Sequence, residues 1–211
     1  MVTMNSLPED WERAAAFHGH TCPGLAIGYR AAKIALRELT SDRANDEELV
    51  AIVETDACGV DAIQVLTGCT LGKGNLIYRD YGKHVFIIGD RKSGAAVRVA
   101  FNGGTWQEDE EYKNLRARVF GGQATPEERE AYGRCQAERW QQILTAPEGE
   151  LFKVEQVELD LPPRARLFHS VTCAYCGEPV AEVRARVREG RPACIPCAEQ
   201  YSRGWGFISP A

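Results

Sequence analysis

The sequence lacks the features of a membrane-spanning or exported protein. No stretch approaches the roughly 18 consecutive apolar residues of a membrane-spanning helix, so we expect no transmembrane segment and no membrane partner. Residues 1–6 contain neither a basic segment nor an apolar core, so they do not resemble a signal peptide. Together these absences predict a cytoplasmic protein.

The chain also lacks an excess of basic residues. Its net charge of −5 argues against a protein that coats nucleic acid along its whole surface. The charge is unevenly distributed, because residues from Leu161 onward include seven Arg, four Glu and no Lys, a net +3 that leaves −8 for the rest. Any contact with nucleic acid would therefore be local to the C-terminal segment.

Two cofactor motifs are absent. The chain has no C-x-x-C-x-x-C run of the kind that holds an iron–sulfur cluster. Its glycine-rich segment, residues 67–75, fails as a phosphate loop because Thr67 replaces the first glycine and Gly74 replaces the final Ser or Thr. Nucleotide hydrolysis is thus not expected. The backbone amides of this loop and Lys73 still suit a carboxylate or phosphate group of a ligand.

What the chain does have is eight cysteines, four of them in two C-x-x-C pairs near the C-terminus. Seventeen residues separate Cys173-x-x-Cys176 from Cys194-x-x-Cys197, a spacing typical of a tetrahedral zinc site. Four thiolate ligands leave no open position, so the site is expected to be structural. The alternatives are a rubredoxin-like iron site and a pair of redox dithiols. The scattered remaining cysteines favour a reducing compartment over a disulfide scaffold.

The segment between the two pairs alternates apolar and polar residues from Ala181 to Arg188, which predicts one β-strand. Residues 189–190 supply a turn, residues 191–193 a return strand, and residues 198–201 the start of a short helix. This order predicts a treble-clef finger. On such a strand Arg184, Arg186 and Arg188 would share one face, either as a solvated surface or as a contact for phosphates or an acidic partner.

A second cluster of metal-ligating residues lies near the N-terminus. His18, His20 and Cys22 occupy alternate positions just before a predicted helix, so two of the three can reach one ion. At the helix N-terminus, Cys22 would be favoured as thiolate by the dipole and the free amides. Cys58 stands between a predicted strand and helix, and Cys69 is a further candidate, although a core position is the more typical explanation for it.

These residues define a candidate core metal site. Mixed Cys and His ligands favour zinc over magnesium or calcium. Asp61 is expected to cap the helix after Cys58 or to orient a histidine ligand. If a water completed the metal coordination, Glu54 or Asp61 would be the nearest general base. Whether the protein is an enzyme stays open at this point.

Hydrophobic periodicity and capping residues predict an α+β core domain of mixed helices and sheet. The expected helices span residues 6–17 (from a Ser6–Glu9 capping box), 21–39 (with Thr21 as N-cap), 60–66, 105–120 and 125–144 (from a Thr125–Glu128 capping box). The expected strands span residues 49–53, 84–88, 95–101 and 151–159, the middle two forming a hairpin. We place the core domain at residues 1–163 and the finger domain at residues 164–211.

Three segments, residues 17–24, 58–64 and 67–75, together closely resemble the FmdE family, which is named after the E component of formylmethanofuran dehydrogenase. The resemblance covers residues 13–100, and the finger resembles that of longer family members. It implies an α+β domain that pairs into an intertwined homodimer, with a metal near the histidine–cysteine motif. The family name comes from association with a molybdenum or tungsten enzyme, whose redox chemistry belongs to other subunits.

The resemblance and the residues together predict a metal-binding accessory protein that is not itself the formylmethanofuran redox catalyst. Zinc is the expected cofactor, and a molybdoenzyme and a small anionic ligand are the candidate partners. The candidate residues are Cys173, Cys176, Cys194 and Cys197 for structural zinc, His18, His20, Cys22, Cys58 and Cys69 for the core metal, and Asp61, Gln64, Lys73 and Asn75 for ligand binding.

Two other hypotheses stay open. One is a metal- or metabolite-sensing regulator whose finger binds nucleic acid or a partner protein. The other is a dimeric subunit whose finger clasps a partner chain, with the apolar tail at residues 205–208 packed on that partner.

Overall fold

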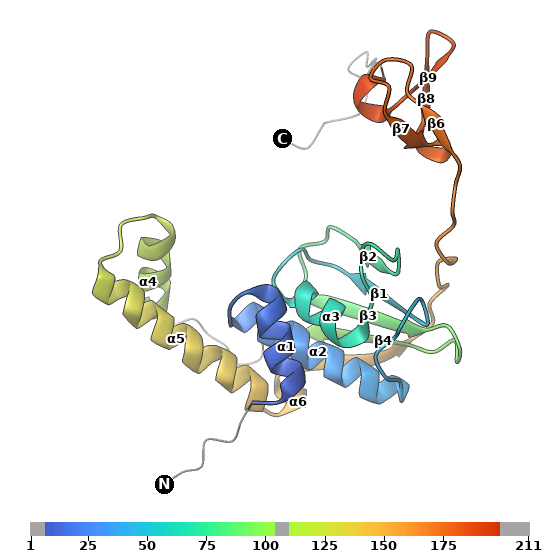
Figure 1. The fold of residues 1–211 in the computed structure, drawn as a ribbon. Helices are drawn as coiled ribbons and strands as arrows, with labels where there is room; N and C mark the ends of the chain where they lie inside the picture. The colour runs from blue at the N-terminus through green and yellow to red at the C-terminus, as the bar shows by residue number, and fades with distance from the viewer. Residues whose placement is uncertain (1–6, 104–109, 199–211) are drawn as a thin grey trace. The chain divides into compact units, whose positions relative to one another are not determined.

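The computed structural model describes residues 7–103 and 110–198, and the chain divides into two units (Figure 1). The first unit spans residues 1–165 and the second spans residues 166–211. The first is built from helices packed on a mixed sheet, and the second is a small, zinc-finger-like unit of short hairpins. The predicted α+β class is confirmed. None of the helices within the described ranges is long and apolar enough to cross a membrane.

A five-stranded sheet with the order β2-β1-β3-β4-β5 forms the centre of the first unit. Only the β1–β2 pair is parallel. The strands are β1 (Leu49–Val53), β2 (Leu76–Tyr78), β3 (Val85–Asp90), β4 (Ala96–Phe101) and β5 (Phe152–Val157). The predicted β1 and the β3–β4 hairpin are confirmed. Sequence reasoning missed β2, which is only three residues long and directly follows a glycine-rich loop.

Three helices pack on one face of this sheet: α1 (Glu9–His18), α2 (Pro23–Leu39) and α3 (Gly59–Thr67) (Figure 1). The main core lies between them, where Leu25 of α2 meets Phe86 and Ile88 of β3. Side chains alternate along a strand, so Ile52 and Ile87 point to the opposite face and form a smaller apolar cluster there.

Two predicted helix starts need correction. Pro8 is the N-cap of α1 and makes no side-chain capping bond, so proline does not lie in the first turn as expected. Ser6, the other end of that predicted capping box, lies outside the described residues. Helix α2 is capped by Cys22, not by Thr21, because the Cys22 Sγ accepts the amide hydrogen of Leu25. A thiol can therefore take the place of the usual Ser or Thr oxygen.

Helices α4 (Glu110–Phe120) and α5 (Pro126–Thr145) form a helical hairpin, and the one-turn helix α6 (Glu148–Leu151) leads into β5. The capping box between Thr125 and Glu128 is confirmed. Residues 105–109 of the helix expected from Thr105 lie outside the described residues. The C-terminal half of α5 packs on the core, where Trp140 stacks on Trp11 of α1 with ring centroids 5.4 Å apart.

The second unit contains two antiparallel hairpins, β6 (Ser170–Thr172) with β7 (Pro179–Ala181), and β8 (Arg186–Arg188) with β9 (Arg191–Ala193). The single strand predicted over residues 181–188 is wrong. A 3₁₀ turn at Glu182–Arg184 interrupts it, closed by the Ala185 amide donating to the carbonyls of Ala181 and Glu182. Arg184 therefore does not share a strand face with Arg186 and Arg188.

The turn at Glu189–Gly190 and the return strand are confirmed, with both turn residues in the left-handed region. The second cysteine pair lies on a 3₁₀ turn, Ile195–Cys197. Ala198 is extended and does not begin a helix, and the rest of the helix expected there, together with the apolar tail, lies outside the described residues.

Candidate metal centres

The close crossing of α2 and α3 positions the candidate core site. A Cβ atom added at Gly28 of α2 would lie 2.0 Å from the carbonyl oxygen of Gly59, the first residue of α3. The two backbones are therefore in direct contact, which only glycine permits. This contact brings the helix starts together: a Cβ at Gly24 would lie 3.1 Å from Cys58 Cβ and 3.9 Å from Cys22 Sγ.

His18, His20 and Cys22 gather at the end of α1 and the start of α2. One potential ligand atom from each lies within 4.8 Å of the other two. The His18 Nε2 lies 3.8 Å from Cys22 Sγ, and the imidazole centroids of His18 and His20 are 4.4 Å apart. Glycine at position 19 allows this tight arrangement, since it ends α1 with a φ of 89°. The geometry suits a metal with mixed nitrogen and sulfur ligands.

The carboxylate of Asp61 on α3 holds the ring of His18 from behind. Asp61 Oδ2 lies 2.7 Å from Nδ1 of His18, and the amide of Gln64 donates to Asp61 Oδ1 at 3.3 Å. A carboxylate on Nδ1 fixes the proton on that nitrogen and leaves Nε2 available as a metal ligand. Asp61 and Gln64, both predicted from the sequence as ligand-binding residues, thus lie behind His18 as a hydrogen-bonded pair.

The thiol of Cys22 differs from its expected ionisation. Burial raises the pKa of Cys22 to about 11, and the neighbouring Cys58 thiol adds to this, against the opposing hydrogen bond from the Leu25 amide. The expectation that the helix N-terminus favours a thiolate here is wrong for the metal-free protein, because desolvation outweighs the amide hydrogen bonds. A bound zinc would displace the thiol proton, as thiolate ligation requires.

The other two candidate cysteines occupy different environments. Cys58 is half-buried next to Cys22 and lines a cavity beside the cluster, although it is not one of the three gathered donors. Cys69 is fully buried in the main core, where desolvation raises the pKa of its thiol. The structure brings Cys58 to the site and leaves Cys69 in the core.

Lys73 and Asn75 serve the loop that contains them. Lys73 Nζ donates to the carbonyls of Asn45 and Asp46. The fully buried side chain of Asn75 donates to the carbonyls of Asp46 and Leu49, and it accepts the amide of Thr70. These bonds fasten residues 70–75 to the segment before β1. Neither side chain lines the cavity beside Cys58.

That cavity has a volume of about 470 Å³. Sequence reasoning missed three of its polar lining residues, Thr55, Asp56 and Tyr78. Asp56 and Thr55 lie in the polar segment that contains Cys58, which is the signal that marks them, whereas Tyr78 belongs to the unpredicted β2. Glu54, the other candidate general base, is buried and is not part of the lining, which comprises His18, Val53, Thr55, Asp56, Ala57, Cys58, Val60, Asp61, Gln64, Leu71, Leu76 and Tyr78.

In the second unit, the four cysteines of the C-x-x-C pairs converge. Their Sγ atoms all lie within 4.8 Å of one another, all four are free thiols, and Cys176 Sγ is 3.8 Å from Cys194 Sγ. Backbone amides of Cys176, Cys194 and Tyr175 donate to Cys173 and lower the pKa of its thiol to about 6. The nearby sulfur atoms raise the pKa of Cys197 to about 12. A divalent cation would relieve this crowding, so the donor set fits structural zinc.

The arginines of this unit have separate roles. Arg188 donates from Nη1 to the carbonyl of Cys197 at 2.9 Å and lies over the ring of Tyr175 at 4.6 Å. Arg191 lies over the same ring at 4.9 Å. Arg188 thus supports the loop that carries the second cysteine pair, while Arg184 and Arg186 are exposed.

Comparison with known proteins matches each unit separately. Residues 17–153 match the family described as FmdE, molybdenum formylmethanofuran dehydrogenase operon, and residues 166–203 match the prokaryotic dksA/traR C4-type zinc finger. The chain is similar to the crystal structure of an FmdE-like protein of tungsten formylmethanofuran dehydrogenase type from Syntrophus aciditrophicus. The TM-score is 0.60, with 26% identity over 88% of each chain.

Among curated proteins, the chain is similar to one from Archaeoglobus fulgidus named probable S-adenosyl-L-methionine-binding protein. The two are 35% identical over 196 residues, which cover 90% of this chain and 52% of that protein. The chain thus spans about half the length of its curated relative. Because the family match covers well over half of the sequence, the chain belongs to the FmdE family and carries a C4-type zinc-finger domain at its C-terminal end.

Proposed function

We propose that this protein is a metal-binding accessory protein with two zinc sites, one in the core and one in the finger. The core ligands are His18, His20 and Cys22, with Cys58 as the fourth. One observation carries this assignment: the carboxylate of Asp61 holds Nδ1 of His18, while Nε2 of the same ring faces Cys22 Sγ. A carboxylate behind a histidine is the usual support of a metal-ligating imidazole.

Zinc in the finger serves a structural role. Four cysteine thiolates complete its tetrahedral coordination and leave no position for a substrate. The hairpin and the turn that carry the two cysteine pairs support the treble-clef order expected from the sequence. A unit with so few buried residues depends on its metal to fold.

The formylmethanofuran redox reaction is not assigned to this chain, since the sequence has no cysteine run for an iron–sulfur cluster. A molybdoenzyme partner, a homodimer and a cytoplasmic location stay predictions from sequence and family resemblance. Binding of nucleic acid by the finger has little support, because the 3₁₀ turn separates Arg184 from the other two arginines and Arg188 is committed to Cys197 and Tyr175.

Metal content per chain tests the proposal. We expect elemental analysis to find two zinc atoms in the wild-type protein and one in a Cys22→Ser/Cys58→Ser variant. Cys135→Ser is the matched control, because Cys135 is a half-buried free cysteine on α5 and belongs to neither cluster. This control should retain two zinc atoms. One zinc atom in both the wild type and the double variant would contradict a core metal site.

A second candidate function is binding of S-adenosyl-L-methionine in the cavity beside Cys58. The name of the Archaeoglobus relative suggests the ligand, and the cavity lining gives it independent support. Two carboxylates, Asp56 and Asp61, lie on the wall, and no Lys or Arg is among the described residues that line it. This lining favours a cationic group such as a sulfonium over the small anion expected from the loop at Lys73. Its volume is within the usual range of a ligand site.

The charge on sulfur offers a sharp test of this second function. We expect calorimetric titration to show tighter binding of S-adenosyl-L-methionine than of S-adenosyl-L-homocysteine, which lacks the sulfonium charge. Asp56→Asn should reduce that preference, whereas Glu130→Gln, on the exposed side of α5, should leave it unchanged. Equal affinity for both ligands in the wild-type protein would contradict recognition of the sulfonium by the carboxylates.

A further inference from the structure

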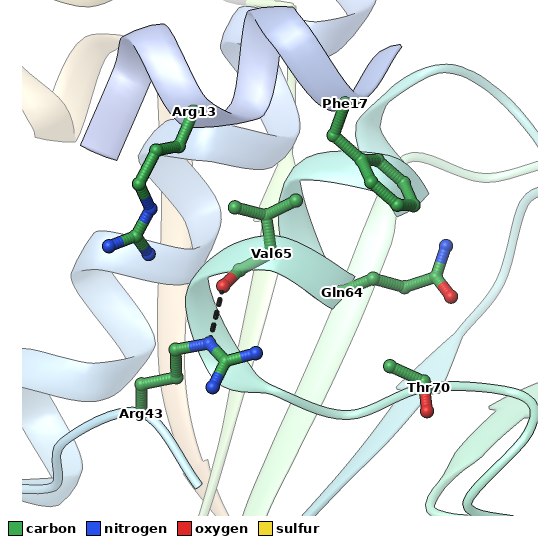
Figure 2. Close-up of a pocket in the computed structure, with 6 residues that line it drawn as sticks. All are labelled: Arg13, Phe17, Arg43, Gln64, Val65 and Thr70. Atoms are coloured by element: carbon green, nitrogen blue, oxygen red, sulfur yellow. Dashed lines mark hydrogen bonds between the residues drawn. The ribbon is translucent and has the colours of Figure 1, made fainter. Parts of the chain in front are cut away.

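A second hollow lies on the other side of Gln64, between α1, the end of α3 and the segment before β1 (Figure 2). Its volume is about 340 Å³. Figure 2 shows Arg13 and Phe17 extending from α1, Gln64 and Val65 from α3, and Arg43 and Thr70 from the flanking loops. Arg13 and Phe17 are four residues apart, so they share one face of α1. We call this hollow the Arg13–Arg43 pocket.

The two arginines of this pocket are not neutralised by carboxylates of the described residues. Arg43 donates from Nε to the carbonyl of Val65 at 2.9 Å and from Nη1 to that of Ala44 at 3.5 Å. These two bonds orient its guanidinium and leave its Nη2 donors open to a ligand. Within the described part of the chain, Arg13 has neither an ion pair nor a hydrogen bond from its side chain.

Nearby cations differ in this respect. Lys33 and Arg37 line the adjoining hollow, which also includes Arg13 and Arg43. Lys33 pairs with Asp10 at 2.7 Å, and Arg37 pairs with Glu148 at 2.8 Å. Among the residues described, the local surface thus pairs its other cations with carboxylates and leaves the two guanidinium groups at the pocket without one. A site of this kind attracts anions, and the fork geometry of Arg suits carboxylate or phosphate oxygens.

The remaining lining is apolar with two polar groups. Phe17 is 59% exposed and Val65 is half-buried, so both offer apolar surface to an occupant. Thr70 and Gln64 supply a hydroxyl and an amide. A bare inorganic anion would use only the arginines, whereas an anion carried on a flat apolar group would also cover Phe17 and Val65.

We propose that the Arg13–Arg43 pocket binds a small organic anion. Arg13 and Arg43 hold its carboxylate or phosphate group, and Phe17 and Val65 contact its apolar body. The site is distinct from the cavity beside Cys58, with which it shares the side chain of Gln64 alone. Because it requires no metal, it does not depend on the proposed zinc function. Gln64 connects the two, since it also donates to the Asp61 carboxylate behind His18.

Calorimetric titration with simple aryl anions tests this proposal on the full-length protein. The probes are phenyl phosphate and benzoate, with inorganic phosphate as the anion without an apolar body and benzyl alcohol as the neutral analogue. We expect saturable binding of at least one aryl anion, with weaker binding of inorganic phosphate and none of benzyl alcohol. Comparing the two aryl anions distinguishes a phosphate ligand from a carboxylate ligand. Absence of saturable binding of both at about 10 mM would overturn the proposal.

Two variants and a control assign the binding to this pocket. Arg13→Gln should weaken binding about tenfold, the change expected on loss of one charge-assisted hydrogen bond. Arg43→Lys keeps the charge and loses the fork, and it should weaken binding as well. Arg129→Gln, an exposed arginine on α5, is the matched control and should bind as the wild type does. Unchanged affinity in Arg13→Gln would overturn the proposal.

The Cys22→Ser/Cys58→Ser variant separates this site from the core metal. If the pocket binds the anion, this variant should bind phenyl phosphate as the wild-type protein does, whether or not the core holds zinc. Loss of binding in this variant would show that the anion ligates the core metal, which would overturn the pocket assignment.

Discussion

The Nδ1 atom of His18 lies 2.7 Å from Oδ2 of Asp61, although 43 residues separate the two in the chain. His18 is the last residue of α1, and Asp61 lies in the first turn of α3. This bond fixes the tautomer of the imidazole and turns Nε2 towards Cys22. The arrangement is that of a metal ligand supported by a carboxylate.

Removal of this carboxylate should weaken the core zinc site. We expect Asp61→Ala to lower zinc affinity of the core site by about 10- to 100-fold, because His18 loses the group that orients it. Competition with a chromophoric chelator measures the effect. Asp56→Ala is the matched control, since Asp56 lines the same cavity and makes no bond to His18. Equal affinities in the two variants would show that Asp61 does not act through His18.

The glycine contact between α2 and α3 predicts a large loss of stability for a very small change. Gly28→Ala should lower the free energy of unfolding by about 3 kcal/mol, because the added methyl group would overlap the backbone of Gly59. Gly133→Ala on α5 meets no atom within 4 Å and should raise the free energy of unfolding by about 1 kcal/mol. Urea denaturation measures both. Similar effects of the two substitutions would refute a specific backbone contact at Gly28.

Arg30 links α2 to the end of α5. Its Nη1 donates to the carbonyls of Ile143, Leu144 and Ala146 at 2.7 to 3.0 Å, so it satisfies the free carbonyl groups at that helix terminus. We expect Arg30→Met to destabilise the protein by about 2 kcal/mol, since Met retains the apolar stem and loses the charged donors.

The matched control for Arg30 is Arg134→Met. Arg134 forms an exposed pair with Glu130 on the same helix, and loss of such a pair costs less than about 0.5 kcal/mol. Thermal and urea unfolding of both variants gives the comparison. If Arg30→Met costs no more than Arg134→Met, the carbonyl contacts contribute nothing to stability.

Asp10 on α1 predicts a dependence of stability on pH. Burial alone would raise its pKa, but hydrogen bonds from Lys33 and Tyr29 outweigh burial and hold the pKa below its usual value of 3.8. A lowered folded pKa contributes stability that is present above the unfolded pKa and is lost as pH falls through the folded pKa.

Asp10→Asn should therefore lower the free energy of unfolding at pH 7, and the difference from wild type should shrink below pH 3.8. Urea unfolding at the two pH values measures it. Glu12→Gln removes an exposed carboxylate from the same helix and should show little difference at either pH. A difference for Asp10→Asn that does not change with pH would contradict this account.

Local sequence signals were sufficient for much of the fold. The five apolar residues of β1, the Thr125–Glu128 capping box and the turn at Glu189–Gly190 each specify their element through neighbouring residues alone. The short β2 carried no such signal, because its pairing with β1 depends on a distant partner. Alternation also misled over residues 181–188, where backbone bonds at Ala185 close a turn inside an apparently regular strand.

The candidate sites show the same division. Residue types and spacing alone were sufficient to propose the two metal clusters, since ligands close in sequence form both halves of each. The Gln64–Asp61–His18 chain depends on how α1 meets α3, and the sequence indicated its members without their order. Desolvation of Cys22 also required the fold, because a helix N-terminus seen in sequence alone suggests a thiolate. Arg13 and Arg43 had no signal at all, as they meet only in three dimensions.

Cobalt binding offers a test of the core site that is independent of the finger. Full-length protein carrying Cys194→Ser and Cys197→Ser has lost half of its finger ligands, which leaves the core as the remaining cluster with histidine and thiol donors. We expect one equivalent of Co²⁺ to give thiolate-to-cobalt charge-transfer absorption with the ligand-field bands of a tetrahedral site. Adding Cys22→Ser should abolish the charge-transfer absorption. Absence of this absorption, or its persistence after Cys22→Ser, would contradict a metal site built on His18 and Cys22.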